Sequence, residues 1–393
     1  MFSKQPLSVL LISTLSMIIA FSVWSVFAPI AADIQVMYSL TNAEKSILIA
    51  TPVLLGSLMR IPMGILTDRF GGRKVYSLTM LALLLPTICA GFTHSYSMLL
   101  FWAFFIGMAG TTFAISITYV SKWYSPQKQG FILGIAGMGN LGSAVASFSI
   151  PLIFSSFGLP WVFWSLAIAV ALMALLLWVG TSDHPSAASP KTLQESLSVL
   201  KFKETWFLSV FYFLTFGGFV TFSIYLPTIL HDQFNASTVD SGLKTAVFVV
   251  LATFVRPLGG YLSDVFGAKK VLTFVFTGML LIGLFIAFTI TAFSLFSVGC
   301  LLAAITLGIG NGAVFKMVPS VSTGNIGAVT GIVGAFGGVG GFFPPIVLGF
   351  IKDTSGDYVV GFSLLALFAL FCLLLNYSGF KKQNVRINQK HLA

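Results

Sequence analysis

The chain has 393 residues, of which 57% are hydrophobic and only 8% carry a charge, and its mean hydropathy is +0.97. These values lie outside the range of soluble globular domains and indicate a protein with several membrane-spanning helices. The excess of basic residues, 21 Lys and Arg against 11 Asp and Glu, would suggest nucleic-acid binding only if those residues formed one patch.

Twelve apolar runs, each long enough to cross a bilayer as a helix of about 20 residues, follow one another along the chain. The first is too long for the core of a signal peptide, so we expect it to be retained as the first helix. We expect spans at residues 7–31, 46–66, 75–93, 97–120, 130–154, 160–180, 206–230, 242–262, 270–291, 293–315, 326–350 and 358–380.

One long polar interruption, residues 181–205, separates six spans from six. The sequence therefore predicts an all-α membrane protein with twelve transmembrane helices in two six-helix halves. The N-terminal half is residues 1–180, and the C-terminal half with its basic tail is residues 206–393. The interruption is expected to be a cytoplasmic linker with a short interfacial helix at 191–203.

The basic residues fall mainly on one side of the predicted membrane. Of the 21, sixteen lie in loops on the side of the termini, three lie on the opposite side, and two lie inside spans. This asymmetry follows the positive-inside rule and places both termini in the cytoplasm of a multi-pass protein of the cell inner (plasma) membrane. It also accounts for the basic balance, so nucleic acid is not expected as a partner.

The second and eighth spans repeat one pattern, LMRIPMGILTDRFGGRKV at 58–75 and FVRPLGGYLSDVFGAKKV at 254–271. A shift of 196 positions aligns Arg60 with Arg256, each a lone cation in an apolar run. A cation in hydrocarbon costs roughly 2.5 to 3.5 kcal/mol on insertion scales. All eleven acidic residues fall in loops or at span ends, so we expect the two arginines to face each other and hold an anion.

The loop that follows each arginine resembles the loop signature of the major facilitator superfamily. Its first copy is Gly64, Asp68, Arg69, Gly71, Arg73 and Lys74, and its second copy is Gly260, Asp264, Gly267, Lys269 and Lys270. The resemblance implies two parallel halves with a substrate site between them near the midplane. We expect a cytoplasmic latch made of Asp68, Arg69, Arg73, Asp264 and Lys270, and we interpret Lys316 as an interfacial anchor.

Two spans at equivalent places are rich in glycine. The fifth contains Gly130, Gly134, Gly137, Gly139, Asn140 and Gly142, and the eleventh contains Gly327, Gly331, Gly334, Gly337, Gly338, Gly340 and Gly341. Glycines four apart let helix backbones approach closely. Together with the paired arginines, these stretches resemble the signatures of the nitrate/nitrite porter family within that superfamily.

This second resemblance implies a transporter of nitrate, nitrite or both, and a set of substrate-binding residues. They are Arg60, Arg256, Phe113, Asn140, Tyr212, Phe216, Gly137, Gly331 and Gly334. A planar guanidinium suits a planar oxyanion, with the two Phe rings above and below the anion and the Asn and Tyr side chains donating sideways. The chain departs from the family at Gly334, where the family has a serine.

The histidines and acids all fall at span ends or in loops, so no titratable group for proton coupling is predicted at depth. This favours nitrate/nitrite exchange by alternating access, in which a bound anion reduces the repulsion between the two arginines. Proton-coupled nitrate symport and transport of another small anion remain open. A nitrate sensor that does not transport is disfavoured because the sequence shows no appended soluble domain.

The remaining chemistry-bearing residues suggest no enzyme. The sequence contains no Ser/His/Asp set and no phosphate loop. Cys89, Cys300 and Cys372 lie inside apolar runs without metal-ligand spacing, so neither a metal nor a cofactor is expected. The expected partners are nitrate, nitrite and the lipid bilayer. Because one chain supplies both halves, we expect a functional monomer.

Overall fold

A computed structural model describes residues 4–124, 126–183, 198–321 and 326–379, and these are almost entirely helical. Twelve helical stretches within them are long and apolar enough to cross a membrane, which confirms the predicted fold class and number of spans. The first six spans contain α1 (Lys4–Trp24), η1 (Ala28–Ile30), α2 (Ala31–Tyr38), α3 (Asn42–Leu58), α4 (Arg60–Phe70), α5 (Gly72–Ala90), α6 (Tyr96–Ile106), η2 (Gly107–Thr111), α7 (Thr112–Ser121), α8 (Pro126–Gly137), η3 (Met138–Asn140), α9 (Leu141–Phe157) and α10 (Leu159–Gly180). The last six are α12 (Lys203–Phe234), α13 (Thr238–Phe266), α14 (Ala268–Thr289), α15 (Phe293–Val321), α16 (Ile326–Ser355) and α17 (Val359–Gly379).

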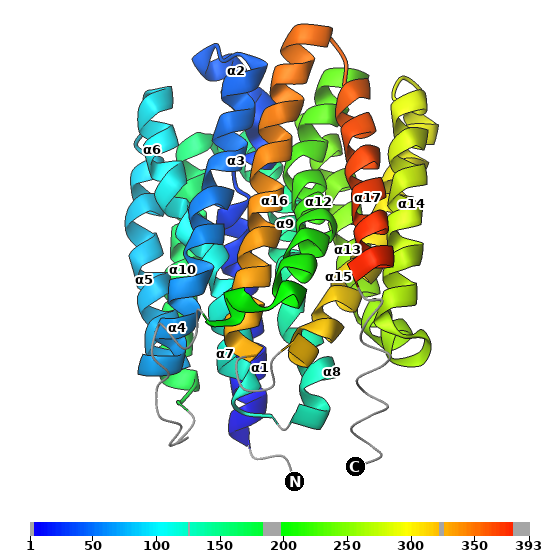
Figure 1. Ribbon diagram of the computed structural model, residues 1–393. Helices are drawn as coiled ribbons and strands as arrows, with labels where there is room; N and C mark the ends of the chain where they lie inside the picture. Colours follow the sequence, from blue (N-terminus) through cyan, green and yellow to red (C-terminus); the bar gives the residue numbers. More distant parts are fainter. Residues whose placement is uncertain (1–3, 125, 184–197, 322–325, 380–393) are drawn as a thin grey trace, which may run out of the picture.

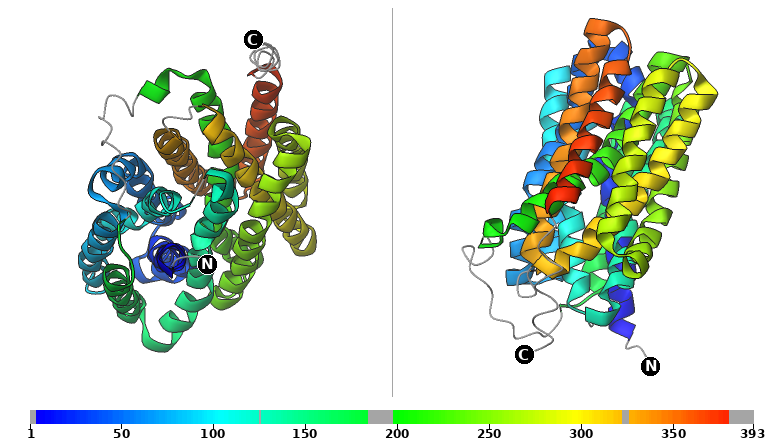
Figure 2. Two further views of the ribbon diagram at one scale, coloured as in Figure 1. Left: turned by 90° about the horizontal axis from the view of Figure 1, so that it is seen from below. Right: turned by 45° about the vertical axis from the view of Figure 1, so that its right-hand side comes forward.

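The spans stand side by side, and α1 begins on the same side of the bundle on which α17 ends (Figure 1). We call this the terminus side and the opposite one the far side. Viewed from the terminus side, helices α1–α10 and helices α12–α17 gather in two neighbouring groups (Figure 2, left), which we call the N-terminal and C-terminal halves. Of the predicted linker, residues 184–197 lie outside the described residues, including most of the predicted helix at 191–203. Ser198–Lys201 forms the short 3-10 helix η4 before α12.

The second span is broken where a continuous helix at 46–66 was predicted. Helix α3 ends at Leu58 and α4 begins at Arg60. Pro62 explains the break, because its ring has no N–H to donate and crowds the carbonyl of the residue four positions earlier, Leu58. The eighth span, α13, continues without a break through Pro257. Arg60 therefore stands at a helix junction, whereas Arg256 stands inside a helix.

Helix α3 packs antiparallel against α16, and the two helices approach closely. A Cβ atom built at Gly349 would lie 2.3 Å from Ser46 Oγ, and one built at Gly338 would lie 2.1 Å from Ser57 Oγ. The constant register of these pairs means that α16 follows α3 over about three turns. Only glycine fits at these two positions of α16, because any larger residue would push the helices, and with them the two halves, apart.

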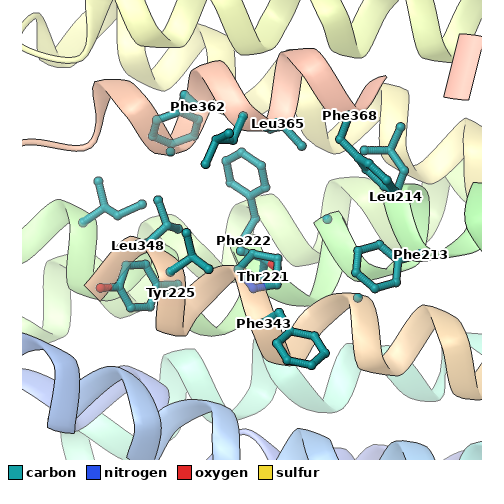
Figure 3. A pocket seen from close by; sticks show the side chains of 17 residues that line it. Phe213, Leu214, Thr221, Phe222, Tyr225, Phe343, Leu348, Phe362, Leu365 and Phe368 are labelled. Carbon is teal, nitrogen blue, oxygen red and sulfur yellow. The ribbon is translucent and has the colours of Figure 1, made fainter. Parts of the chain in front are cut away.

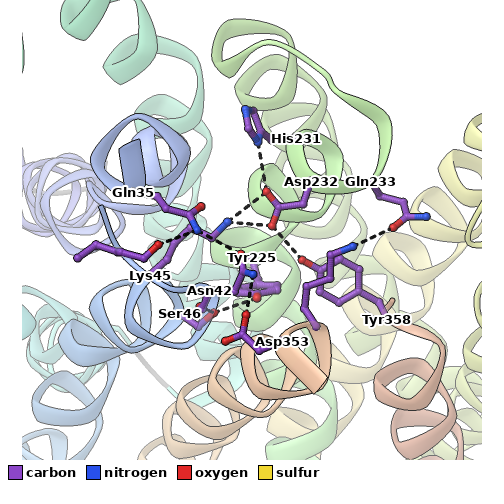
Figure 4. Close-up of polar contacts among 12 residues, drawn as sticks. Gln35, Asn42, Lys45, Ser46, Tyr225, His231, Asp232, Gln233, Asp353 and Tyr358 are labelled. Atoms are coloured by element: carbon purple, nitrogen blue, oxygen red, sulfur yellow. Dashed lines mark hydrogen bonds and ion pairs between the residues drawn. The ribbon is translucent and has the colours of Figure 1, made fainter. Parts of the chain in front are cut away.

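On the far side, polar contacts join the halves to each other. Asp353 at the end of α16 accepts hydrogen bonds from Asn42 Nδ2 at 2.7 Å and from the Ala43 N–H at 3.0 Å. Thr238 Oγ1 of α13 donates to Asp33 of α2 at 2.8 Å. Close to the first pair, Lys45 of α3 meets Asp232 of α12 (Figure 4). These contacts hold the far side closed in this conformation.

Candidate anion-binding site

Arg60 is completely buried at the junction of α3 and α4. Its Nε donates to the carbonyl of Gly110 at 3.2 Å, and its Nη1 donates to the carbonyl of Gly334 at 2.7 Å. Its Nη2 has no hydrogen-bond partner among the described residues. Both acceptors are neutral carbonyls, so the charge of this guanidinium is not neutralised by them.

Arg256 is the counterpart in the C-terminal half and is 8% exposed. Its Nη2 donates to the hydroxyl of Tyr212 at 3.2 Å, whereas its Nη1 is buried without a partner in the described part of the chain. Gly137 lies beside it, because a Cβ built there would be 3.7 Å from Arg256 Cζ and Nη1. Each arginine thus keeps one donor nitrogen unused, and burying such a group without a hydrogen bond is costly.

A single aromatic ring connects the two arginines. The Phe113 ring centre lies 5.1 Å from Arg60 Cζ and 5.8 Å from Arg256 Cζ, so the two guanidinium groups are no farther apart than the sum of these distances. Phe216 lies 5.2 Å from Arg60 Cζ. These contacts are within the range of cation–π attraction, which partly offsets the burial of the charges. The predicted clamp residues are therefore brought together across the two halves.

The aromatic side chains are arranged differently from the prediction. The rings of Phe113 and Phe216 were expected above and below an anion, but in this conformation their centres are 6.1 Å apart at an angle of 36°. That is the spacing of two rings in direct contact, with no room for a layer between them. Tyr212 stacks on Phe216 at 4.9 Å and 10°. The rings therefore lie beside the arginines but supply no hydrogen-bond acceptor to the two buried, unpaired nitrogens.

Phe315 of α15 is a wall of this site that the sequence analysis missed. Its ring centre lies 5.4 Å from Arg256 Cζ, 6.0 Å from Phe113 and 4.9 Å from Tyr212. A signal was present in the sequence, since Gly110-x-x-Phe113 of the fourth span has the same spacing as Gly312-x-x-Phe315 of the tenth. The two Phe residues are thus equivalents in the two halves, as the two arginines are.

Of the other predicted binding residues, Gly331 and Gly334 have contacts next to this centre. Asn140, in η3, is buried, and its Oδ1 has no partner among the described residues. A Cβ built at Gly334 would meet the Phe113 ring at 3.9 Å, and one built at Gly331 would meet Ile61 Cα at 3.9 Å. These two glycines therefore face the seam between the halves with space for a small side chain.

Neither arginine forms an ion pair with a carboxylate among the side chains that the structure describes, which do not include that of Asp68. In the same part of the chain, no group of three or more His, Cys, Asp or Glu residues could hold a metal ion. What the arrangement offers is two cations and two unpaired guanidinium nitrogens among aromatic side chains. Such a site can accept a small anion that takes several hydrogen bonds in one plane.

The predicted latch residues are placed separately on the terminus side. Asp264 forms an ion pair with Lys316, which had been interpreted as an interfacial anchor. The Arg73 N–H donates to Asp183 at 2.9 Å, and its guanidinium lies 4.3 Å from the Trp178 ring. Arg69 lies 5.4 Å from the ring of its neighbour Phe70, and Lys270 is exposed. The side chain of Asp68 lies outside the described residues.

A cavity of about 240 Å³ lies elsewhere, between α12, α16 and α17 (Figure 3). Its lining is formed by apolar side chains such as Phe213, Phe222, Leu348 and Phe368, together with Thr221 and Tyr225. None of its lining residues is charged. Because its lining has no cationic group to bind an anion, the arginine pair stays the candidate site.

Comparisons with known proteins agree with this geometry. The sequence model of the Major Facilitator Superfamily matches residues 13–343 and 208–388. The chain is 38% identical to the nitrite extrusion protein of Bacillus subtilis, with 95% of this chain and 94% of that protein covered. It is 36% identical to the probable nitrate transporter NarT of Staphylococcus epidermidis, with 98% and 99% covered.

Solved structures with the same fold are more distant in sequence. A bacterial homologue of the human lysosomal transporter Spinster, in an inward-facing and occupied conformation, superimposes with a TM-score of 0.72 at 18% identity, with 96% of this chain and 97% of that chain covered. At this identity the likeness concerns the fold alone.

Proposed function

The chain belongs to the Major Facilitator Superfamily and, within it, to the nitrate/nitrite porter family, and from this premise we propose that it carries nitrate and nitrite across the cell membrane. It is a multi-pass membrane transporter and not an enzyme. The relatives whose names describe nitrate transport or nitrite extrusion match it over nearly their whole length. Transport of these anions requires a site that discriminates a small planar oxyanion from water and from larger solutes.

The observation that carries the proposal is the pair of buried guanidinium groups, each with one unpaired nitrogen. A planar anion between them accepts from Arg60 Nη2 and Arg256 Nη1, the two donors that have no partner among the described residues. Charge-assisted hydrogen bonds of this kind are about twice as strong as neutral ones. Tyr212 keeps Arg256 oriented through its hydroxyl, and Phe113 keeps the two cations at a fixed separation.

The proposed mode is exchange of one anion for another by alternating access. When an anion leaves, two cations face each other in a low-dielectric site and repel, which disfavours the rocking motion that closes the halves over the site. A bound anion reduces the repulsion and permits the motion. The absence of an ion-paired carboxylate at either arginine, among the described side chains, supports exchange. Proton-coupled uptake and another small anion are the competing assignments.

The orientation that goes with this proposal places the terminus side in the cytoplasm. The predicted loops on that side carry sixteen of the 21 basic residues, as the positive-inside rule requires. The closed far side then faces outward. One chain supplies both arginines, so the proposed working unit is a monomer.

The test is nitrate uptake into proteoliposomes preloaded with nitrite, compared with vesicles that contain no nitrite and carry an inward proton gradient. Wild type, Arg60→Lys and Arg256→Lys are compared, with Lys203→Arg as a control for a basic substitution at the start of α12. Uptake that needs internal nitrite and disappears in both Arg→Lys variants is the expected result. Proton-driven uptake into vesicles without nitrite would contradict exchange and indicate symport. Normal uptake by either Arg→Lys variant would show that the two arginines do not form the anion-binding site.

A further inference from the structure

Lys45 is a nearly inaccessible lysine that lies between the two halves on the far side. It stands in the first turn of α3, whose start is fixed by a capping box in which Thr41 and Glu44 exchange hydrogen bonds. Its side chain is 1% exposed, and its ammonium contacts Asp232 of α12 at 2.8 Å and 3.1 Å (Figure 4). A buried ammonium without its counter-ion would be strongly destabilising.

The two partners of this ion pair depend on each other unequally. Asp232 also accepts a hydrogen bond from the Tyr358 hydroxyl at 3.1 Å and contacts His231 Nδ1 at 3.2 Å, and both residues belong to the C-terminal half. Burial raises the pKa of the Tyr358 phenol, so this hydroxyl is protonated and donates to Asp232 in this conformation. The Lys45 ammonium contacts only Asp232 among the described residues. Separation of the halves on the far side leaves Asp232 with two partners and Lys45 with none.

Lys45 lies at the far end of the face of the second span that meets the C-terminal half. On that face, Ser46 Oγ contacts the Tyr225 hydroxyl at 2.9 Å, Ser57 lies against Gly338, and Arg60 donates to Gly334. Lys45 precedes Arg60 by 15 residues, or about 22 Å of helix rise. An anion that moves from the far side to the clamp along this seam therefore passes Lys45 first.

The described residues on the far side include more acids than lysines, so a lysine there that loses its counter-ion is important for attracting an anion. In the part of the chain that the structure describes, six acidic residues stand on that side against three lysines; the acids are Asp33, Glu44, Asp232, Asp240, Asp353 and Asp357, and the lysines are Lys45, Lys244 and Lys352. Lys244 pairs with Asp240 in its own helix, and Lys352 donates to the Gly356 carbonyl at 2.8 Å. Both keep these partners when the halves separate, whereas Lys45 does not.

We propose that Lys45 is the receiving site for the small monovalent anion on the far side, masked by Asp232 while that side is closed and released when it opens. The inference rests on the proposed transport function and extends it with a second anion contact outside the arginine clamp. Asp232 acts as the internal competitor of the incoming anion. Because an anion bound to Lys45 excludes the ion pair, its binding favours the open far side.

The action of such a site is mainly electrostatic. An exposed ammonium attracts an anion over roughly a Debye length, about 10 Å at 0.1 M salt, so its contribution falls as ionic strength rises. A charge near the approach to a site raises the association rate more than the final affinity. Removal of the charge should therefore raise the KM for anion offered on the far side and reduce the dependence of kcat/KM on salt.

The experiment measures nitrate exchange in right-side-out membrane vesicles preloaded with nitrite, at several concentrations of an inert salt. The variants are Lys45→Met, Lys45→Arg, Asp232→Asn and the double variant Lys45→Met with Asp232→Asn. We expect a several-fold higher KM and a flatter salt dependence of kcat/KM for Lys45→Met, and recovery of both in Lys45→Arg. Asp232→Asn loosens the same pair but keeps the cation, so its KM should equal or fall below that of wild type.

If either single variant fails to fold, the double variant still tests the proposal, because removing both charges leaves neither one without its counter-ion. It should show the same raised KM and flat salt dependence. The proposal would be overturned if kcat/KM depended on salt in Lys45→Met or in the double variant as it does in wild type. It would also be overturned if Asp232→Asn raised the KM as much as Lys45→Met does. If wild type exchanges and Arg60→Lys does not, such a result refutes the receiving site alone, whereas absence of exchange in wild type refutes the transport function.

Discussion

Arg60 donates from Nη1 to the carbonyl oxygen of Gly334 at 2.7 Å, and this bond joins the second span of the N-terminal half to the eleventh span of the C-terminal half. The same two spans meet again at Ser57 and Gly338, and at Ser46 and Gly349, on the way to the far side. An anion that accepts from the unpaired Nη2 therefore binds the same guanidinium group that helps to hold the halves together through Nη1. The chemistry of the site and the contact between the halves share one side chain.

Gly334→Ser should be tolerated and should strengthen anion binding. A Cβ at this position meets only the Phe113 ring, at 3.9 Å, and the hydroxyl adds a donor beside Arg60. A hydrogen bond of this type contributes about 0.5–1.5 kcal/mol, so we expect a KM for nitrate lower by a factor of about 2 to 10. Gly338→Ser is the matched control. Its Cβ would lie 2.1 Å from Ser57 Oγ, so this substitution should lower the yield of folded protein. An unstable Gly334→Ser protein would show that the seam is tighter than described.

Gly137→Ala should weaken anion binding without loss of stability. The added methyl group would stand 3.7 Å from Arg256 Nη1, in ordinary contact, and would cover the side from which an anion reaches that nitrogen. Loss of a hydrogen bond to a charged group costs about 1.5–3 kcal/mol, which corresponds to a roughly tenfold or larger rise in the nitrate Kd. Gly134→Ala, in the same helix with open space around its Cβ, should bind normally. Equal affinities for the two variants would mean that Arg256 Nη1 does not contact the anion.

Phe315→Leu should relax the discrimination among anions. The ring contributes a cation–π contact with Arg256, worth about 0.5–2 kcal/mol, and packs edge-on against Phe113 and Tyr212. We expect a higher KM for nitrate together with inhibition of exchange by larger planar anions that leave the wild type unaffected. Phe288→Leu, at a ring that is 85% exposed on α14, serves as the control. Unchanged competition profiles would exclude Phe315 from the wall of the site.

Asp264→Asn should slow turnover and leave affinity unchanged. Its ion pair with Lys316 joins α13 to α15 at the terminus side, and both side chains are about half exposed. An exposed pair contributes only about 0–1 kcal/mol to stability, so the variant should fold normally. The expected result is a lower kcat at constant KM, the same effect in Lys316→Gln, and no further effect in the double variant. A raised KM at normal kcat would contradict a role in conformational change.

The number of spans and the arginine pair could be predicted from the sequence because both depend on local patterns. Apolar runs of the right length define the helices, and a repeat at offset 196 relates Arg60 to Arg256. The same offset does not align the two equivalent phenylalanines, Phe113 and Phe315. It aligns Phe113 with residue 309, six positions before Phe315, because the loops between spans differ in length in the two halves. The repeat must be realigned span by span before it reveals Phe315.

Contacts between helices far apart in the sequence could not be predicted, for a different reason. Lys45 and Asp232 are 187 residues apart and each stands at a span end, where a charged residue ordinarily faces water. Only the packing of α3 against α12 shows that the lysine is buried. Similarly, the sequence placed Asp264 and Lys316 on one side of the membrane but gave no reason to pair them. The break at Met59 was also missed, since the apolar run continues across it.

The most direct test of the arginine clamp is the thermal stability of the purified protein in detergent, with and without nitrate, against an equal concentration of an inert salt. A ligand at 100 times its Kd stabilises the folded state by about 2.7 kcal/mol, so nitrate should raise the Tm of wild type by several degrees. In Arg60→Leu and Arg256→Leu we predict that the nitrate-dependent shift is lost while the Tm without nitrate is equal to or higher than that of wild type, because an uncompensated buried cation has been removed. A full nitrate-dependent shift of the Tm in either variant would contradict anion binding by the two arginines.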